Sequence, residues 1–306
     1  MQDYLDPVML DLQPDLVVCD GELYVPTYCK TRGIPCISIA SPNYISLDFG
    51  PYKQYATLIA QLLNHSTLIL GYAARDCEPS PLLDKSLLSM VSPPMKYDRS
   101  ELVPERIREK YGFNEQDQIV LVYRGAGNIF TQEFLAESQK IIDIPVNLFL
   151  TDLQYRYPHM KLIVVSGSLV NVPAHENICF ESHVDFMELA SISSLVIARA
   201  GRNVVYEMAY LGVPSILVGI DSQTDLCRNC EIAAQWKIAW PVNSADLNES
   251  TLLNMIERAL VAEEAEKIAY NGRVFVPENG VLAVVEKIVE ISNAQGLSSR
   301  KNGRKI

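Results

Sequence analysis

Basic side chains are scarce in this sequence. Its 306 residues hold 26 lysines and arginines against 37 aspartates and glutamates, so the formal net charge is −11, and the isoelectric point is about 4.9. A general nucleic-acid-binding protein presents a basic face. The acidic balance argues against that class of protein, and no nucleic-acid partner is expected.

Cysteine and histidine are too sparse for a disulfide framework or a metal centre. The seven cysteines, an odd number in a chain of this size, are typical of reduced and mostly buried thiols. Cys227 and Cys230 form a C-x-x-C pair, but no second pair and no histidine lies near them in the sequence. No metal site is therefore predicted.

Long apolar runs are also missing. The longest stretch without charge, residues 54–74, contains Gln, Asn, His, Ser and Thr, which favours a helix followed by a buried strand over a membrane span. Residues 1–11 carry three aspartates and no basic segment, unlike a signal peptide. We expect a cytoplasmic protein.

The composition that remains is that of a soluble α/β protein, with 48% hydrophobic and 21% charged residues. Short apolar runs alternate with helical patterns, which predicts parallel sheets covered by helices on both faces. The expected strands are 16–19, 36–39, 67–70, 88–91, 118–123, 162–166, 178–181, 195–198, 215–218 and 238–241. The expected helices include 24–31, 52–63, 131–142, 185–191, 202–211, 227–236, 252–262 and 281–292.

One stretch divides this pattern in two. Residues 92–105 hold three prolines and several charges, which is typical of a domain linker. We therefore expect two Rossmann-like domains, a short first domain over 1–95 and a second over 96–292, followed by a disordered basic tail over 293–306. Ligands of such sheets bind at the carboxyl ends of the strands.

The stretch VIARAGRNVVYE, residues 196–207, predicts a strand, a turn and a helix start. Helix-start N–H groups lack intrahelical partners and carry the positive end of the helix dipole. Arg199 and Arg202 add two cations there, and Gly201 permits close approach of a phosphate. Glu207 follows in the second turn, where a carboxylate can accept the hydroxyl hydrogens of a ribose. A surface helix start with incidental charges is the alternative.

Two further stretches follow strands. In VYRGAGNIF, residues 122–130, Gly125 and Gly127 suit a loop that passes close to a ligand, although the third glycine of a dinucleotide fingerprint is absent. A plain tight turn is the alternative. In LGVPSILVGIDSQTDLCRN, residues 211–229, polar side chains follow a buried strand and suit sugar hydroxyls. A hydrophilic loop with a helix cap at Asp225 is the alternative there.

Taken together, the stretch FMELASISSLVIARAGRNVVYEMAYLGVPSILVGIDSQTDLCRN resembles the donor domain of MurG-like GT-B glycosyltransferases and the wider UDP-glycosyltransferases. The shared features are a strand, an Arg-x-Gly turn, a Glu-bearing helix, Gly-x-Pro and a polar loop. The resemblance covers residues 119 to about 242 and extends back through LQPDLVVCDGELYVPTYCKTRGIPCISIASPN. It implies metal-independent transfer of a sugar from a UDP-sugar, a substrate rather than a cofactor, to an acceptor hydroxyl.

The resemblance also assigns residues to the two ends of the donor. The matches at the nucleotide end are Gly125, Gly127, Phe186, Met187, Arg199, Gly201, Arg202, Asn203 and Glu207. Glu207 would bind the ribose, and Phe186 and Met187 match the segment near the uracil. The matches at the sugar end are Gln223, Asp225 and Asn229, the first two in swapped order relative to the family.

The family's opening strand and glycine-rich loop have no counterpart before residue 16. No general base can be named; Asp20 and Glu22, at a strand end, are the nearest candidates. The apolar runs LVVC and CISI predict strands buried on both faces, so missing neighbours would leave an open sheet edge. A second chain or a homo-oligomer that completes the first domain is therefore a hypothesis.

Other functions remain open on the same residues. A UDP-sugar epimerase or hydrolase would use the same fold, and a nucleotide-sugar-binding subunit would bind UDP without catalysing transfer on its own. The acceptor class also stays open between a small molecule, a lipid-linked acceptor and a glycan. A lipid-linked acceptor would bring the protein to the membrane periphery.

Overall fold

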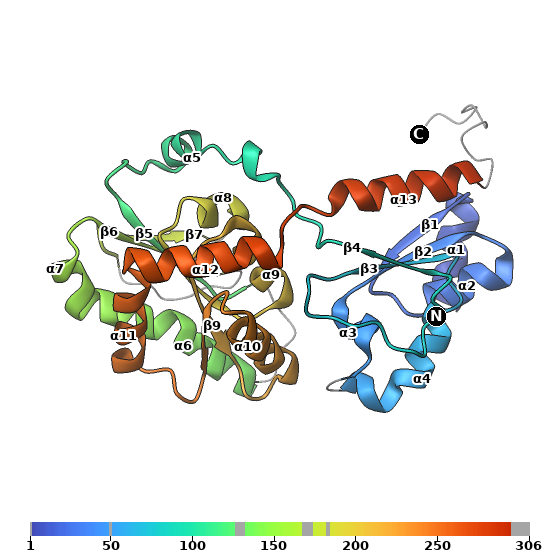
Figure 1. Cartoon of the computed structure of the whole chain (residues 1–306), viewed down its shortest axis with the longest axis horizontal. Helices are drawn as coiled ribbons and strands as arrows, with labels where there is room; N and C mark the ends of the chain where they lie inside the picture. Colours follow the sequence, from blue (N-terminus) through green and yellow to red (C-terminus); the bar gives the residue numbers. More distant parts are fainter. Residues whose placement is uncertain (1, 49–50, 126–131, 167–173, 182–183, 295–306) are drawn as a thin grey trace. The chain divides into compact units, whose positions relative to one another are not determined.

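The computed structural model describes residues 2–48, 51–125, 132–166, 174–181 and 184–294. The chain forms two compact units, Met1–Met95 together with Glu278–Ile306, and Lys96–Pro277 (Figure 1). The first break, after residue 95, coincides with the expected end of the first domain. The second differs from expectation, because residues 278–292 group with the first unit and not with the second.

The first unit is built on a parallel sheet whose strands follow chain order. The order is β1-β2-β3-β4, with bounds Val17–Asp20, Cys36–Ala40, Leu68–Tyr72 and Leu88–Val91. Right-handed connections between strands added in one direction place their helices on one face. These helices are α2 (Val25–Arg32), α3 (Pro42–Ser46) and α4 (Pro51–Leu63), and α1 (Gln2–Leu12), which precedes β1, packs beside α2. Their buried side chains pack against Cys36, Ala40 and Ile69 of the sheet.

The opposite face of this sheet is covered by the last helix, α13 (Val281–Ala294). Val284 is buried against Ile37 and Leu70, with Ile288 and Ile291 beside it. The strands are apolar on both faces, as CISIA shows, so both faces need cover. The segment between β3 and β4 forms no helix that could cover this face. The need for cover therefore explains why α13 joins the first unit.

The second unit is built on a parallel sheet in which the strand order reverses. The order is β10-β9-β8-β5-β6-β7. In chain order the bounds are Gln118–Tyr123, Met160–Val165, Ile178–Glu181, Leu195–Arg199, Ser215–Gly219 and Trp240–Asn243. After β5 the chain adds β6 and β7 on one side, then returns to add β8, β9 and β10 on the other. The reversal lies between β5 and β8, where loops leaving the carboxyl ends diverge and open a crevice.

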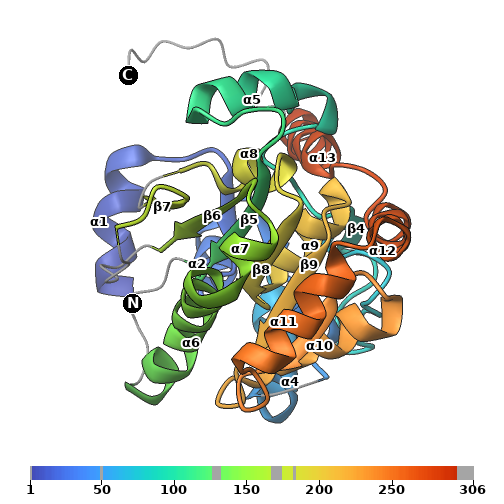
Figure 2. The ribbon, with the colours of Figure 1, turned by 90° about the vertical axis from the view of Figure 1, so that its left-hand side faces the viewer.

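Helices cover both faces of this sheet. On one face α6 (Gln132–Leu148) packs with α11 (Glu249–Ala259) over a core that includes Val120, Val122 and Ile197 (Figure 2). Right-handed connections place α9 (Arg202–Leu211) and α10 (Thr224–Trp236) on the other face. The remaining helices are α5 (Pro104–Tyr111), α7 (Gln154–Arg156), α8 (Phe186–Ser191) and α12 (Ala262–Phe275), with the short turns η1 (Arg99–Glu101) and η2 (Phe149–Leu153).

All ten predicted strands are present, but α12 was not predicted. Its sequence contains Asn271 and Gly272, a pair that locally favours a turn. In the structure Gly272 lies where α12 crosses α9: a Cβ there would come within 2.7 Å of the Ala209 carbonyl oxygen. The glycine is therefore explained by a close helix crossing, which the local sequence does not reveal.

Candidate functional site

A hollow of about 330 Å³ opens at the point where the strand order of the second sheet reverses. It is lined by the last residue of β5, the turn after β8 and the start of α9: Tyr123, Gly125, Arg199, Gly201, Arg202, Asn203 and Val204. Five of these seven residues are predicted nucleotide-site residues. The structure thus brings the two glycine-containing turns of the sequence together around one hollow.

The turn between β8 and α9 leaves the helix start facing this hollow. Gly201 is the N-cap of α9, in an extended conformation (φ −66°, ψ 144°), and supplies no side-chain cap. A Cβ at Gly201 would meet no protein atom within 4 Å. Neither strain nor packing therefore requires glycine here. The open space lies in front of helix-start N–H groups, an arrangement that suits a phosphate.

Two arginines bring positive charge to the hollow. Arg199 is largely buried, and this burial lowers the pKa of its guanidinium, while the nearby charge of Arg124 acts in the same direction. Gly125 has φ +90° and makes room for this side chain, because a Cβ there would lie 2.8 Å from an Arg199 guanidinium nitrogen. The guanidinium of Arg202 lies 5.7 Å from the centre of the Tyr206 ring. Partly desolvated cations of this kind interact strongly with a diphosphate.

Glu207 occupies the second turn of α9. Burial raises the pKa of its carboxyl to about 7, and the negative charge of Asp185 acts in the same direction. Asp185 is the N-cap of α8, whose helix packs beside α9. Near neutral pH the carboxyl is thus poised between two protonation states. Hydroxyl donors from a ribose would stabilise the ionised form.

An aromatic pair forms next to the hollow. The ring of Phe186, the first residue of α8, stacks on Tyr123 with centroids 4.2 Å apart and an interplanar angle of 27°. Met187 is only 2% exposed and belongs to the core. Tyr123 lines the hollow but is not among the predicted site residues. Its position as the last residue of a strand, directly before an Arg-Gly turn, was the available signal.

The residues predicted for the sugar end lie around the start of α10. Gln223 is its N-cap, and Asp225 is in its first turn. Asn229 is 3% exposed, and its Nδ2 donates a hydrogen bond of 2.7 Å to the Ala200 carbonyl. In the structure Asn229 therefore braces the turn before Gly201. The sugar contacts of all three residues stay predictions.

The candidates for the general base belong to the first unit, and the hollow belongs to the second. Asp20 and Glu22 are exposed residues of the first unit, at and after the end of β1. Gly127 lies outside the described residues. Within the described ranges no group of three His, Cys, Asp or Glu side chains is placed to hold a metal ion. Cys230 of the C-x-x-C pair is buried and donates to the Leu217 carbonyl.

Residues 118–273 match the sequence pattern described as the glycosyltransferase family 28 C-terminal domain, over half of the chain. The chain belongs to glycosyltransferase family 28. The match contains β5, β8 and α9, so the hollow lies inside the family 28 domain. The resemblance to MurG-like enzymes is thereby confirmed.

Curated relatives of this family 28 chain carry the name UDP-N-acetylglucosamine--N-acetylmuramyl-(pentapeptide) pyrophosphoryl-undecaprenol N-acetylglucosamine transferase. The protein from Exiguobacterium sp. is 26% identical over 203 residues, which are 63% of this chain and 53% of the relative. The protein from Rickettsia typhi is 26% identical over 162 residues, 47% of this chain and 42% of the relative. The chain spans about half the length of the curated relatives it matches.

Solved structures share the fold. Acinetobacter baumannii MurG has a TM-score of 0.56 at 16% identity, with 93% of this chain and 76% of that chain covered. Arabidopsis thaliana UGT89C1 complexed with UDP has a TM-score of 0.66 at 13% identity, with 95% and 77% covered. The predicted α/β fold with two Rossmann-like domains of GT-B type is confirmed. In the part of the family 28 chain that is described, no helix is both long and apolar enough to cross a bilayer.

Proposed function

We propose that this protein transfers a sugar from a UDP-sugar to an acceptor hydroxyl. The observation that carries the proposal is the hollow at the start of α9, where Arg199 and Arg202 flank an uncapped helix N-terminus. Such a site binds a diphosphate and stabilises the negative charge that develops on it as it departs. Curated relatives named as UDP-N-acetylglucosamine transferases support UDP as the carrier and an N-acetylhexosamine, or a hexose, as the sugar.

The reaction makes one bond and breaks one. The acceptor oxygen attacks the anomeric carbon, the bond between that carbon and the diphosphate oxygen breaks, and the acceptor proton passes to a base. Arg199, Arg202 and the helix N-terminus act on the leaving diphosphate, so that charge stabilisation requires no metal ion in this proposal. Glu207 accepts hydrogen bonds from the ribose hydroxyls. Asp20 and Glu22 stay the candidates for the base.

We also propose a class of acceptor and a partner. The relatives' name includes a pyrophosphoryl-undecaprenol, so a lipid-linked acceptor is proposed before a small molecule or a glycan. A second chain, or a second copy of this one, is proposed to pair with β1. Among the described residues this strand has β2 as its sole strand neighbour, and its Val18 is 43% exposed. Light scattering of the purified protein measures its mass in solution, and a strict monomer at all concentrations contradicts self-association.

Calorimetry with a panel of nucleotides tests the site itself. UDP and UDP-sugars are expected to bind more tightly than ADP or GDP. Glu207→Ala should weaken UDP binding at least about tenfold, because hydrogen bonds to a charged group contribute strongly. Glu257→Ala, which removes an exposed carboxylate on α11, is the matched control. Equal affinity for all nucleotides, or full affinity in Glu207→Ala, contradicts the proposal.

Turnover assays separate transfer from its alternatives. A transferase releases UDP from a UDP-sugar when an acceptor hydroxyl is supplied. Release of free sugar without an acceptor indicates a hydrolase, and interconversion of UDP-sugars without net release indicates an epimerase. Tight UDP binding with transfer only after a second chain is added indicates a partner-dependent subunit.

A further inference from the structure

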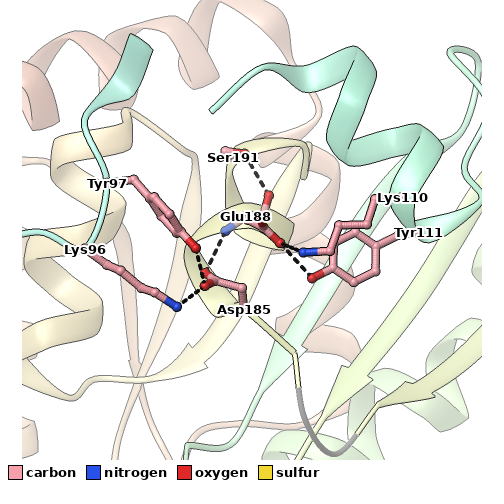
Figure 3. A network of polar contacts seen from close by, with 7 residues as sticks. All are labelled: Lys96, Tyr97, Lys110, Tyr111, Asp185, Glu188 and Ser191. Carbon is pink, nitrogen blue, oxygen red and sulfur yellow. Dashed lines mark hydrogen bonds and ion pairs between the residues drawn. The ribbon is translucent and has the colours of Figure 1, made fainter. Parts of the chain in front are cut away.

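The first four residues of the second unit, segment 96–99, bind the two helices that flank the hollow. At α8, Lys96 forms an ion pair with Asp185, and the Tyr97 hydroxyl donates to Asp185 Oδ2 at 2.8 Å (Figure 3). At α9, Arg99 Nε donates to the Tyr210 carbonyl at 2.7 Å, and the Arg99 backbone N–H donates to the Tyr210 hydroxyl at 3.1 Å. One short segment therefore connects the start of α8 to the last turn of α9.

The bonds to α8 matter because this helix is short. A helix of six residues has little stability of its own and takes its position from its contacts. Asp185 caps it by accepting from the Glu188 backbone N–H at 3.2 Å. A second Lys-Tyr pair repeats the arrangement from the other side of α8 in Figure 3, since Lys110 pairs with Glu188 and the Tyr111 hydroxyl donates to Glu188 Oε2 at 2.9 Å.

The hydrogen bonds from the tyrosine hydroxyls contribute more to the position of α8 than the ion pairs do. The Lys96 side chain is 64% exposed, and exposed ion pairs contribute little because water screens them. The Asp185 side chain is 10% exposed, so its bond from Tyr97 is a charge-assisted bond largely out of water. Tyr97 therefore fixes the place of the Asp185 carboxylate.

The bonds to α9 act at the end of the helix that carries the diphosphate site. The Tyr210 carbonyl is in the last turn of α9, where a cation is favoured by the helix dipole. The guanidinium of Arg99 also lies 4.1 Å from the centre of the Tyr210 ring. Its other nitrogens donate to the carbonyls of Val276 and Pro277, directly after α12. Arg99 thus holds α9 and the chain after α12 at one point.

Both helices carry residues that are predicted for the nucleotide site. Phe186 follows Asp185 directly and stacks on Tyr123, which lines the hollow. Gly201 and Arg202 begin α9, and Glu207 follows one turn later. A shift of α8 against α9 would change the distance between the aromatic pair and Glu207.

We infer that Tyr97 and Arg99 are positioning residues for the donor nucleotide. They fix α8 against α9, so that the Tyr123–Phe186 pair and Glu207 lie at the spacing that the base and ribose of UDP require. This inference rests on the proposed function. A purely structural role for the same bonds would change stability without changing nucleotide affinity beyond the loss of folded protein.

The test compares two tyrosine variants. Tyr97→Phe removes the hydroxyl that binds Asp185, and Tyr28→Phe removes a hydroxyl that donates to Asp6 at 2.6 Å in the first unit. Both variants lose a tyrosine–aspartate bond beside a basic residue, so both should lower the temperature of thermal unfolding, Tyr28→Phe by less because the Asp6 side chain is 34% exposed. Only Tyr97→Phe is expected to raise the Kd for UDP, by about five- to tenfold, because its lost bond lies beside the nucleotide site. The KM for the UDP-sugar should rise in parallel, with kcat within about twofold.

A second variant and the wild type complete the test. Arg99→Lys keeps the charge but cannot make the forked contacts of a guanidinium, so it should raise the Kd for UDP in the same direction. Wild-type affinity in both Tyr97→Phe and Arg99→Lys overturns the inference, as does an equal loss of affinity in Tyr28→Phe. Absence of UDP binding by the wild type overturns the proposed function, and the inference with it.

Discussion

The two sheets of this protein are both parallel, yet they are assembled differently. In the first sheet each strand is added beside the previous one in a single direction, so its connecting helices share one face and α13 must cover the other. In the second sheet the direction reverses between β5 and β8. The connections then cover both faces, and the crevice at the reversal holds the arginines and the helix start. Reversal of strand order, and not the presence of a parallel sheet, creates the candidate ligand site.

The largest expected effect concerns the cover of the first sheet. Val284→Asp places a charge at a position that is 7% exposed, which should lower the free energy of unfolding of the first unit by about 3–5 kcal/mol. Val285→Asp changes the neighbouring residue, which is 50% exposed, and should have little effect. Calorimetry with and without UDP distinguishes the unfolding of the two units, because UDP binding should stabilise only the second unit. Equal destabilisation by the two variants would contradict the cover of the first sheet by α13.

The next effect concerns Glu207. Because the pKa of this carboxyl is raised to about 7, the folded protein keeps a proton that the unfolded chain releases near pH 4.5. Stability is therefore lost as pH rises through this window, and Glu207→Gln should recover on the order of 2 kcal/mol at pH 8 but almost nothing at pH 4.5. Unfolding of both proteins by urea at the two pH values measures this difference.

The same variant should lose UDP affinity by about tenfold or more, because a neutral amide is a poorer acceptor for two ribose hydroxyls. In the wild type, UDP affinity is expected to fall as pH drops below about 7, where Glu207 takes up a proton. Affinity that is flat between pH 6 and pH 8 in the wild type, or unaltered in Glu207→Gln, speaks against a ribose contact.

A smaller effect is expected at the helix crossing of the second unit. Gly272→Ala adds a Cβ that would lie 2.7 Å from the Ala209 carbonyl oxygen, and such overpacking should cost about 1–3 kcal/mol despite the better helix propensity of alanine. Glu266→Ala, an exposed change on the same helix, is the control. Urea denaturation measures both, and a stabilised Gly272→Ala protein would contradict the close crossing of α9 and α12.

The smallest expected change in stability comes with a specific loss of binding. Gly201→Ala meets no protein atom within 4 Å, so it should cost less than about 1 kcal/mol, the difference between the two residues as helix caps. Its methyl group enters the space in front of the helix start, and UDP affinity should fall about tenfold if a phosphate lies there. Calorimetry of this variant tests whether the crevice of the second sheet binds a diphosphate, since unchanged affinity would mean that the crevice holds no diphosphate.

Much of the site could be predicted because its signals are local. The strand, the Arg-x-Gly turn and the helix of residues 196–207 are contiguous, and α9 has the predicted bounds, Arg202–Leu211. Tyr123 and segment 96–99 were missed because their importance depends on partners far along the chain. Tyr97 binds a residue 88 positions away, and no local pattern encodes that contact.

The sequence by itself determined the ten strands, the break after residue 95 and the residues around the turn before α9, because apolar runs, prolines and glycines act on their immediate neighbours. Only the tertiary structure decided which strands are adjacent, that α13 covers the first sheet, and that Gly272 belongs to a helix. Those outcomes depend on burying apolar faces that lie far apart in the sequence, and such faces select their partners only when the whole chain is folded.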